Sequence, residues 1–84
     1  MTEAEIKATI FETLHRIAPE SDPTQLKGGD DLGRTLDIDS FDFLNLVIGL
    51  HEKLGVEIPE TDYGKLRTLD ALINYLGVRV EHQR

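Results

Sequence analysis

Two short segments of the 84-residue chain begin like metal sites, but neither continues as one. The run Asp37-Ile38-Asp39-Ser40-Phe41 starts like a calcium-binding loop, yet Phe41 stands where an oxygen ligand is needed. His51-Glu52 opens a zinc-protease motif, but Gly55 occupies the position of its second histidine. We therefore expect no metal site.

The sequence also lacks a recognisable set of residues for autonomous catalysis. It contains no cysteine, which excludes disulfides, zinc-thiolate sites and a protein thiol nucleophile. It has no glycine-rich phosphate loop and no nucleophile–base–acid set, and the three histidines are scattered: His15, His51 and His82. We expect a protein that is not an enzyme and has no catalytic residues.

The pattern that remains is Leu36-Asp37-Ile38-Asp39-Ser40-Phe41-Asp42, where a long irregular segment meets an apolar helix. Asp39 is a good N-cap, and Asp42 stands three positions later in a short variant of the capping box. A hydroxyl in the first helical turn can point outward, where a partner protein could reach it. On these residues alone, however, a serine at position 40 usually only helps to start the helix.

The hydrophobic pattern predicts an all-α fold, a small four-helix bundle of three longer helices and one short helix. The first helix spans about Glu3–Ile17, begins with a capping box between Thr2 and Glu5, and ends before Pro19. A long loop then leads to Asp39. Four apolar residues are expected to attach this loop to the core: Leu26, Leu32, Leu36 and Ile38.

The second helix is predicted to begin at Ser40 and to stop at Gly55. Its core-facing residues are predicted to be Leu44, Val47, Ile48 and Leu54, with Phe43, Leu46 and Leu50 on adjoining faces. A short third helix is predicted to begin with Pro59 at its first position, and a fourth, capped by Thr68, to end at Gly77. We expect one domain over residues 1–84, an ordered core of about 3–77, and a frayed tail beyond it.

Charge and hydropathy restrict the partners. The net charge is −7, a surface that repels phosphate backbones and favours basic patches on proteins, so we expect no nucleic-acid partner. Between Asp30 and Asp42 there are five aspartates against Arg34 alone. The longest apolar stretch, within Phe43–Leu50, is too short to cross a bilayer, and the acidic N-terminus is unlike a signal peptide. We expect a cytoplasmic monomer without membrane insertion.

From about Ile6 to Leu76 the chain resembles the acyl carrier protein family. The resemblance rests on Asp39-Ser40 at the start of the second helix and on Gly55-Val56-Glu57-Ile58-Pro59 before a short third helix. It implies that Ser40 receives a 4′-phosphopantetheine arm from coenzyme A, on which acyl or aminoacyl groups travel as thioesters. It also implies that Asp39 helps a phosphopantetheinyl transferase to recognise the serine, and that Phe41 and Asp42 take part in docking.

Several residues depart from the pattern of fatty-acid carriers. Phe41 stands where leucine is usual, and the gap between Asp31-Leu32-Gly33 and Ser40 is longer than the common one. Three positions where such carriers often have glutamate are different: Asn45, His51 and Lys53. These departures favour a specialised carrier that serves acyl- or aminoacyl-activating and acyl-transferring enzymes of a lipid, polyketide or related pathway.

Two other functions stay open at this point. A non-covalent acidic helical interaction module would use the same acidic segment and keep its affinity after Ser40→Ala. A carrier-like structural subunit would use the arm to anchor itself to a partner. If acyl chains enter between the helices, the space would be lined by residues that also form the core: Leu46, Leu50, Ile58, Leu66 and Leu72.

Overall fold

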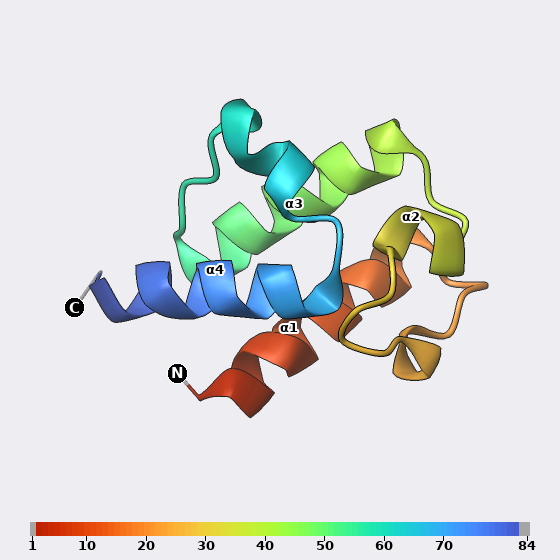
Figure 1. Ribbon diagram of the computed structural model, residues 1–84, viewed down its shortest axis with the longest axis horizontal. Helices are drawn as coiled ribbons and strands as arrows, with labels where there is room; N and C mark the ends of the chain where they lie inside the picture. The colour runs from red at the N-terminus through yellow and green to blue at the C-terminus, as the bar shows by residue number, and fades with distance from the viewer. Residues whose placement is uncertain (1, 83–84) are drawn as a thin grey trace.

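The computed structural model describes residues 2–82, and the side chains of residues 2–80. Six helical elements follow one another: α1 (Glu3–Ile17), η1 (Pro23–Gln25), α2 (Leu32–Thr35), α3 (Ser40–Leu54), η2 (Glu60–Lys65) and α4 (Leu69–His82) (Figure 1). The described residues contain no β-strand. The all-α prediction is therefore confirmed, with α1, α3 and α4 as the three longer helices.

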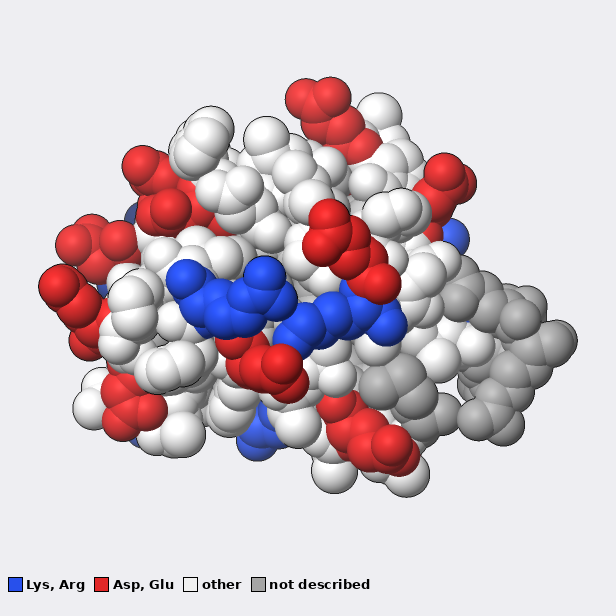
Figure 2. Space-filling view, turned by 180° about the vertical axis from the view of Figure 1, so that it is seen from behind, with Lys and Arg blue, Asp and Glu red and all other residues white. Residues whose placement is uncertain are grey.

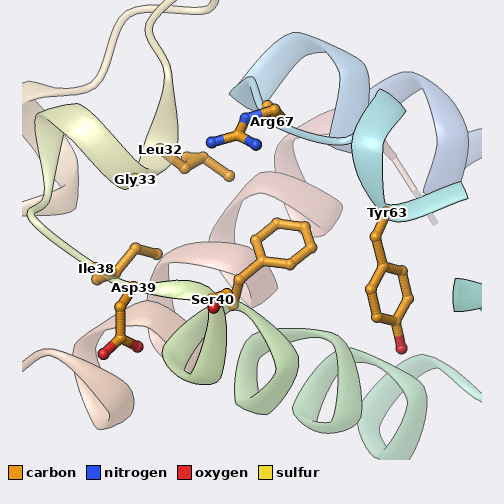
Figure 3. A pocket seen from close by; sticks show the side chains of 8 residues that line it. Leu32, Gly33, Ile38, Asp39, Ser40, Tyr63 and Arg67 are labelled. Carbon is orange, nitrogen blue, oxygen red and sulfur yellow. The ribbon is translucent and has the colours of Figure 1, made fainter.

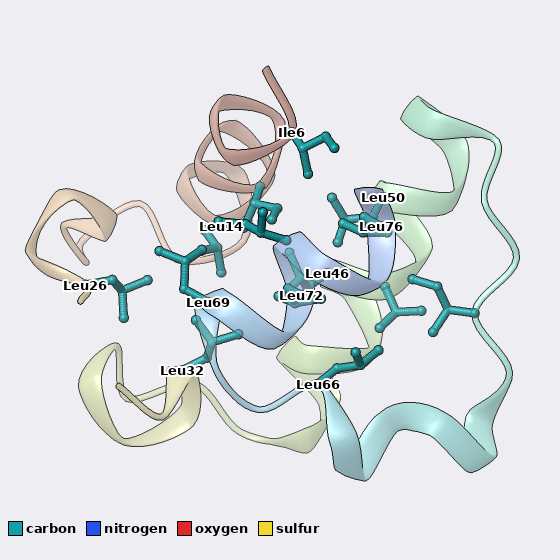
Figure 4. Close-up of a cluster of buried hydrophobic side chains, with 14 of the residues drawn as sticks. Ile6, Leu14, Leu26, Leu32, Leu46, Leu50, Leu66, Leu69, Leu72 and Leu76 are labelled. Carbon is teal, nitrogen blue, oxygen red and sulfur yellow. The ribbon is translucent and has the colours of Figure 1, made fainter. Parts of the chain in front are cut away.

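The core lies between these three helices (Figure 4). Its most deeply buried side chains, each at most 2% exposed, include Ile6, Ile10, Leu14, Leu46, Leu50, Leu72 and Leu76. They recur at helical spacing along α1, α3 and α4, so each helix turns one apolar stripe inward. Burying one such side chain stabilises the fold by about 1.5–3 kcal/mol. The contact between these helices is therefore a large favourable contribution to stability.

The buried face of α3 differs from the predicted one. Leu44 and Ile48, predicted to face the core, are 39% and 47% exposed. The stripe that faces inward is Phe43, Leu46, Val47, Leu50 and Leu54. Apolar residues surround most of α3, so their spacing alone does not single out one face. Contact with α1 and α4 decides which apolar residues are buried, and leaves Leu44 and Ile48 at the surface.

The long segment between α1 and α3 is held as predicted but is more ordered than a plain loop. Its four predicted anchors are at most 8% exposed: Leu26, Leu32, Leu36 and Ile38. Two aspartates begin the short elements within it. The Asp22 carboxylate accepts from the Thr24 N–H at 3.0 Å, and that of Asp31 accepts from the Arg34 N–H at 3.0 Å. These side-chain caps create η1 and α2 without any apolar periodicity.

The short third helix is the 3₁₀ element η2, which begins at Glu60, one residue later than predicted, because Pro59 is extended and serves as its N-cap. None of its residues is fully buried, and a polar cluster around Asp62 joins it to α4. The Tyr75 hydroxyl donates to the Asp62 carboxylate at 2.6 Å, and Lys65 and Arg79 lie 3.7 and 3.5 Å from it. The Arg79 guanidinium also stacks 4.1 Å from the Tyr75 ring. We call these four residues the Asp62 cluster.

The fourth helix does not end at Gly77, as the sequence predicts, but continues past it. The Thr68 hydroxyl accepts from the Ala71 N–H at 3.2 Å, so the predicted cap is confirmed, but α4 continues to His82. A glycine within a helix costs about 1 kcal/mol relative to alanine. Val80, three residues after Gly77, packs against the core, and the burial of its side chain offsets that cost. Residues 78–82 of the predicted tail are therefore helical, while 83–84 lie outside the described residues.

Candidate functional site

Ser40 is the first residue of α3 and is exposed to solvent. A complete capping box precedes it, as predicted. The Asp39 carboxylate accepts from the Asp42 N–H at 2.9 Å, and the Asp42 carboxylate accepts from the Asp39 N–H at 3.4 Å. The two aspartates therefore fix the start of α3 at this serine, with its side chain at the surface in the first turn.

The chain reaches Ser40 through a tight corner. Asp37 has φ 54°, a left-handed backbone that aspartate tolerates better than most residues. The next residue, Ile38, is 8% exposed, and its N–H donates to the Gly33 carbonyl at 3.1 Å. The corner turns the chain from α2 into α3, and the buried isoleucine holds it down. The serine is thus presented on a supported backbone rather than a loose loop.

The sequence has two serines, and the structure uses them differently. The Ser21 hydroxyl donates to the Leu36 carbonyl at 3.0 Å, which ties the long segment to itself. Within residues 2–80, the Ser40 hydroxyl makes no such hydrogen bond. Only the Ser40 hydroxyl is therefore available without the loss of an internal hydrogen bond.

A cavity of about 130 Å³ adjoins the serine (Figure 3). Its lining comes from three parts of the chain: α2, the start of α3, and the region around η2. The lining residues are Leu32, Gly33, Ile38, Asp39, Ser40, Phe43, Tyr63 and Arg67. Phe43 and Tyr63 form an edge-to-face aromatic pair with ring centres 5.9 Å apart. The hollow therefore combines apolar walls with one cationic side chain, Arg67.

Of these lining residues, the sequence pattern assigns Ser40 and Asp39 to the site but does not assign Tyr63 or Arg67. The Leu32-Gly33 pair enters that pattern only as part of a spacing difference. Arg67 reaches the site because its carbonyl accepts from the Leu32 N–H at 2.8 Å, a contact between residues 35 apart in the chain. No local pattern indicates such a pairing.

The aspartates near the serine mostly have local structural roles. Asp39 and Asp42 cap α3, and the Asp30 carboxylate accepts from the Lys27 N–H at 3.0 Å. The Asp31 carboxylate caps α2 and accepts from Arg67 Nε at 3.2 Å. The hydrogen bond from the Arg34 N–H, followed by that from Arg67, lowers the pKa of Asp31. The concentration of acids in this segment is therefore explained in large part by helix starts.

The outer face of α3 next to the serine is apolar. Phe41 is 68% exposed, and Leu44 and Ile48 follow it one and two turns along the helix. Two residues that replace expected glutamates have contacts of their own. Lys53 pairs with Glu12 of α1 at 2.5 Å, and the Nδ1 atom of His51 lies 2.9 Å from the Val56 carbonyl. The part of α3 next to the serine thus exposes three large hydrophobic side chains, while its last turn is polar.

The space-filling view shows the side of the molecule opposite to that in Figure 1 (Figure 2). Lys and Arg side chains gather near the middle of this face, and most Asp and Glu side chains lie around them. The face therefore carries both signs and no continuous basic surface. Within residues 2–80, no group of three acidic or histidine side chains is arranged to hold a metal. Nor is any described helix long and apolar enough to cross a membrane.

Comparisons with known proteins agree with this arrangement. A family model described as "Phosphopantetheine attachment site" matches residues 5–76. The acyl carrier protein of Campylobacter fetus is 36% identical over 72 residues, covering 86% of this chain and 87% of that protein. The acyl carrier protein of Chlorobium phaeovibrioides is 34% identical over 84 residues, covering 90% and 96%. The chain belongs to the acyl carrier protein family of phosphopantetheine-binding proteins.

Proteins of this family are carriers, and they hold 4′-phosphopantetheine covalently. The described residues fit such an arm. Ser40 offers an exposed hydroxyl at a capped helix start, and the adjoining cavity has room for about four water molecules or an equivalent part of a ligand. The arm supplies a terminal thiol, which this cysteine-free chain does not have.

Proposed function

We propose that Ser40 is the attachment site of the 4′-phosphopantetheine arm, and that the protein carries acyl or aminoacyl groups on it as thioesters. The observation that supports this most directly is the exposed Ser40 hydroxyl at the capped start of α3, beside a cavity. A transferase can reach this hydroxyl without unfolding any element. The chain supplies neither base nor metal for the transfer, so the transferase brings both, and the carrier itself catalyses nothing.

We further propose that the protein serves a specialised lipid, polyketide or related pathway in the cytoplasm. Its partners are a phosphopantetheinyl transferase and acyl- or aminoacyl-activating and acyl-transferring enzymes. The support is the surface of α3, where Phe41, Leu44 and Ile48 are exposed. Docking through apolar side chains depends little on salt, whereas docking through exposed charges weakens as salt screens them. We infer that Phe41 contributes most to docking and that Asp42 adds charge.

The first experiment is intact-protein mass spectrometry after incubation with coenzyme A, magnesium and a promiscuous phosphopantetheinyl transferase. The wild type is expected to gain the mass of one phosphopantetheine. Ser40→Ala should gain none. Ser21→Ala is the matched control: it removes the only other serine and should still gain one phosphopantetheine. No gain on folded wild type across several transferases would contradict the proposal and leave the non-covalent interaction module as the better account.

The docking proposal is tested on the same reaction. Phe41→Ala is expected to raise the KM of the transferase several-fold, and this KM should change little between low and moderate salt. Asp42→Asn keeps a side-chain oxygen for the capping box and should have a smaller effect. A KM unaffected by Phe41→Ala but strongly raised by salt would show that charge, and not the apolar face, governs docking.

A further inference from the structure

We propose that Arg67 binds the phosphodiester that joins the arm to Ser40, and so holds the near part of the arm in the cavity. This inference rests on the proposed attachment at Ser40. Arg67 is the only basic residue among those that line the cavity beside the serine hydroxyl. Figure 3 shows its guanidinium beside Leu32, on the side of the cavity opposite to Ser40.

Arg67 is held by two hydrogen bonds, but most of the N–H donors of its guanidinium are not used in them. Its backbone carbonyl accepts from the Leu32 N–H at 2.8 Å, and its Nε donates to Asp31 at 3.2 Å. A guanidinium has five N–H donors, and within residues 2–80 the two terminal nitrogens have no recorded partner. Its side chain is 67% exposed, so a ligand can reach it. The pairing with Asp31 orients the guanidinium and leaves its terminal nitrogens for a phosphate.

The negative charge around Ser40 favours a cation near the attached phosphodiester. Attachment at Ser40 adds a negative phosphodiester next to Asp39 and near Asp37 and Asp42, which are all acidic. A guanidinium on the other side of the cavity offsets this repulsion. Beyond its phosphate, the arm continues with a carbon that bears two methyl groups. The aromatic surface of Phe43 and Tyr63 in the cavity wall suits this apolar group. Charge and shape therefore both direct the arm into the cavity.

The test compares the unmodified and phosphopantetheinylated proteins by NMR. In the wild type, loading is expected to shift the Arg67 Nε–H resonance, and nuclear Overhauser contacts should join the methyl protons of the arm to the rings of Phe43 and Tyr63. Arg67→Gln should shift the ³¹P resonance of the loaded protein and weaken those contacts at least several-fold. Arg34→Gln is the matched control, because it removes an exposed arginine from α2 that does not line the cavity.

The outcomes separate this inference from the proposed function. If mass spectrometry shows no loading at Ser40, the attachment itself is wrong. If loading occurs but the Arg67 Nε–H resonance does not move, the inference alone is overturned. It is also overturned if Arg34→Gln changes the ³¹P shift as much as Arg67→Gln does, since that would indicate a general charge effect. If Arg67→Gln fails to fold, the change of the Arg67 Nε–H resonance on loading of the wild type still tests the inference. Arg67→Lys keeps the positive charge, and its ³¹P resonance should lie closer to that of the wild type.

Discussion

At the scale of single residues, Asp39 has one observed role and one proposed role, which two substitutions can separate. Its carboxylate caps α3 by accepting from the Asp42 N–H. The family resemblance also assigns it a part in recognition by the transferase, and that role depends on its charge. Asparagine caps a helix about as well as aspartate but is neutral. Alanine removes both the cap and the charge.

We therefore expect Asp39→Ala to lower the free energy of unfolding by about 1 kcal/mol, and Asp39→Asn to leave it nearly unchanged. Both substitutions should reduce kcat/KM of the transferase, because both remove the charge next to Ser40. Urea unfolding and loading kinetics on the two variants measure these effects. Normal loading of folded Asp39→Asn would show that Asp39 acts only as a helix cap.

Sequence reasoning at this scale identified Ser40 and the capping pair of Asp39 and Asp42 because caps are encoded by neighbouring residues. It did not identify Arg67 or Tyr63. Both reach the cavity through contacts between distant segments, such as the hydrogen bond from the Leu32 N–H to the Arg67 carbonyl. Their own sequence surroundings do not differ from those of other surface residues. Local patterns thus indicated the proposed attachment site but not the opposite wall of the cavity beside it.

At the scale of elements, two glycines within long helices have opposite surroundings. A Cβ atom on Gly49 of α3 would lie 2.7 Å from Cγ2 of Thr13 in α1, which is too close for either atom to stay in place. A Cβ atom on Gly77 of α4 would lie 3.8 Å from Cδ1 of Ile6, an ordinary contact. The first glycine lets α1 and α3 approach each other, while the second has no such purpose.

Gly49→Ala is expected to destabilise the protein by about 1–3 kcal/mol through overpacking. Gly77→Ala should stabilise it by about 0.5–1 kcal/mol, since alanine loses less chain entropy in a helix. Thermal or urea unfolding measures both. The double variant Thr13→Ser with Gly49→Ala should recover much of the loss, because serine lacks Cγ2 and keeps a hydroxyl for the Thr9 carbonyl. A stable Gly49→Ala single variant would contradict the close packing of these helices.

The element boundaries show where sequence reasoning was sufficient. The starts of α1, α3 and α4 are encoded by Thr2, Asp39 and Thr68, and all three caps are present. The end of α4 was predicted wrongly at Gly77, because a glycine stops a helix only when no packing extends beyond it, and Val80 packs there. The face of α3 was misassigned because apolar residues lie almost all round it. Caps are local, whereas packing depends on the whole fold.

At the scale of the whole molecule, the Asp62 cluster makes a contribution to stability that depends on pH. The hydrogen bond from Tyr75, with smaller effects of Lys65 and Arg79, lowers the pKa of Asp62 below its ordinary 3.8. Burial, followed by the hydrogen bond to Asp62, raises the pKa of Tyr75 above 10.0. The Asp62 contribution is complete above pH 3.8 and is lost as the pH falls through the lowered pKa. The Tyr75 contribution is complete below pH 10.0 and is lost as the pH rises through the raised one.

We expect Asp62→Asn to have a smaller loss of stability than the wild type when the pH falls from 5 to 2, because its side chain cannot be protonated in that range. Urea unfolding at several pH values gives the two slopes. Glu60→Gln, which removes an exposed acid from the same element, should leave the slope closer to that of the wild type. Equal slopes for Asp62→Asn and the wild type would show that other carboxylates govern acid unfolding.

Figure 1 shows one more property of the molecule: α1 begins and α4 ends at the same side, and α3 begins at the opposite side. The long dimension of the molecule is 35 Å. A surface, a tag or a neighbouring domain joined through either end of the chain would therefore stand away from Ser40. The protein can be tethered by its ends, or built into a larger assembly, while its serine and the cavity beside it stay open to visiting enzymes.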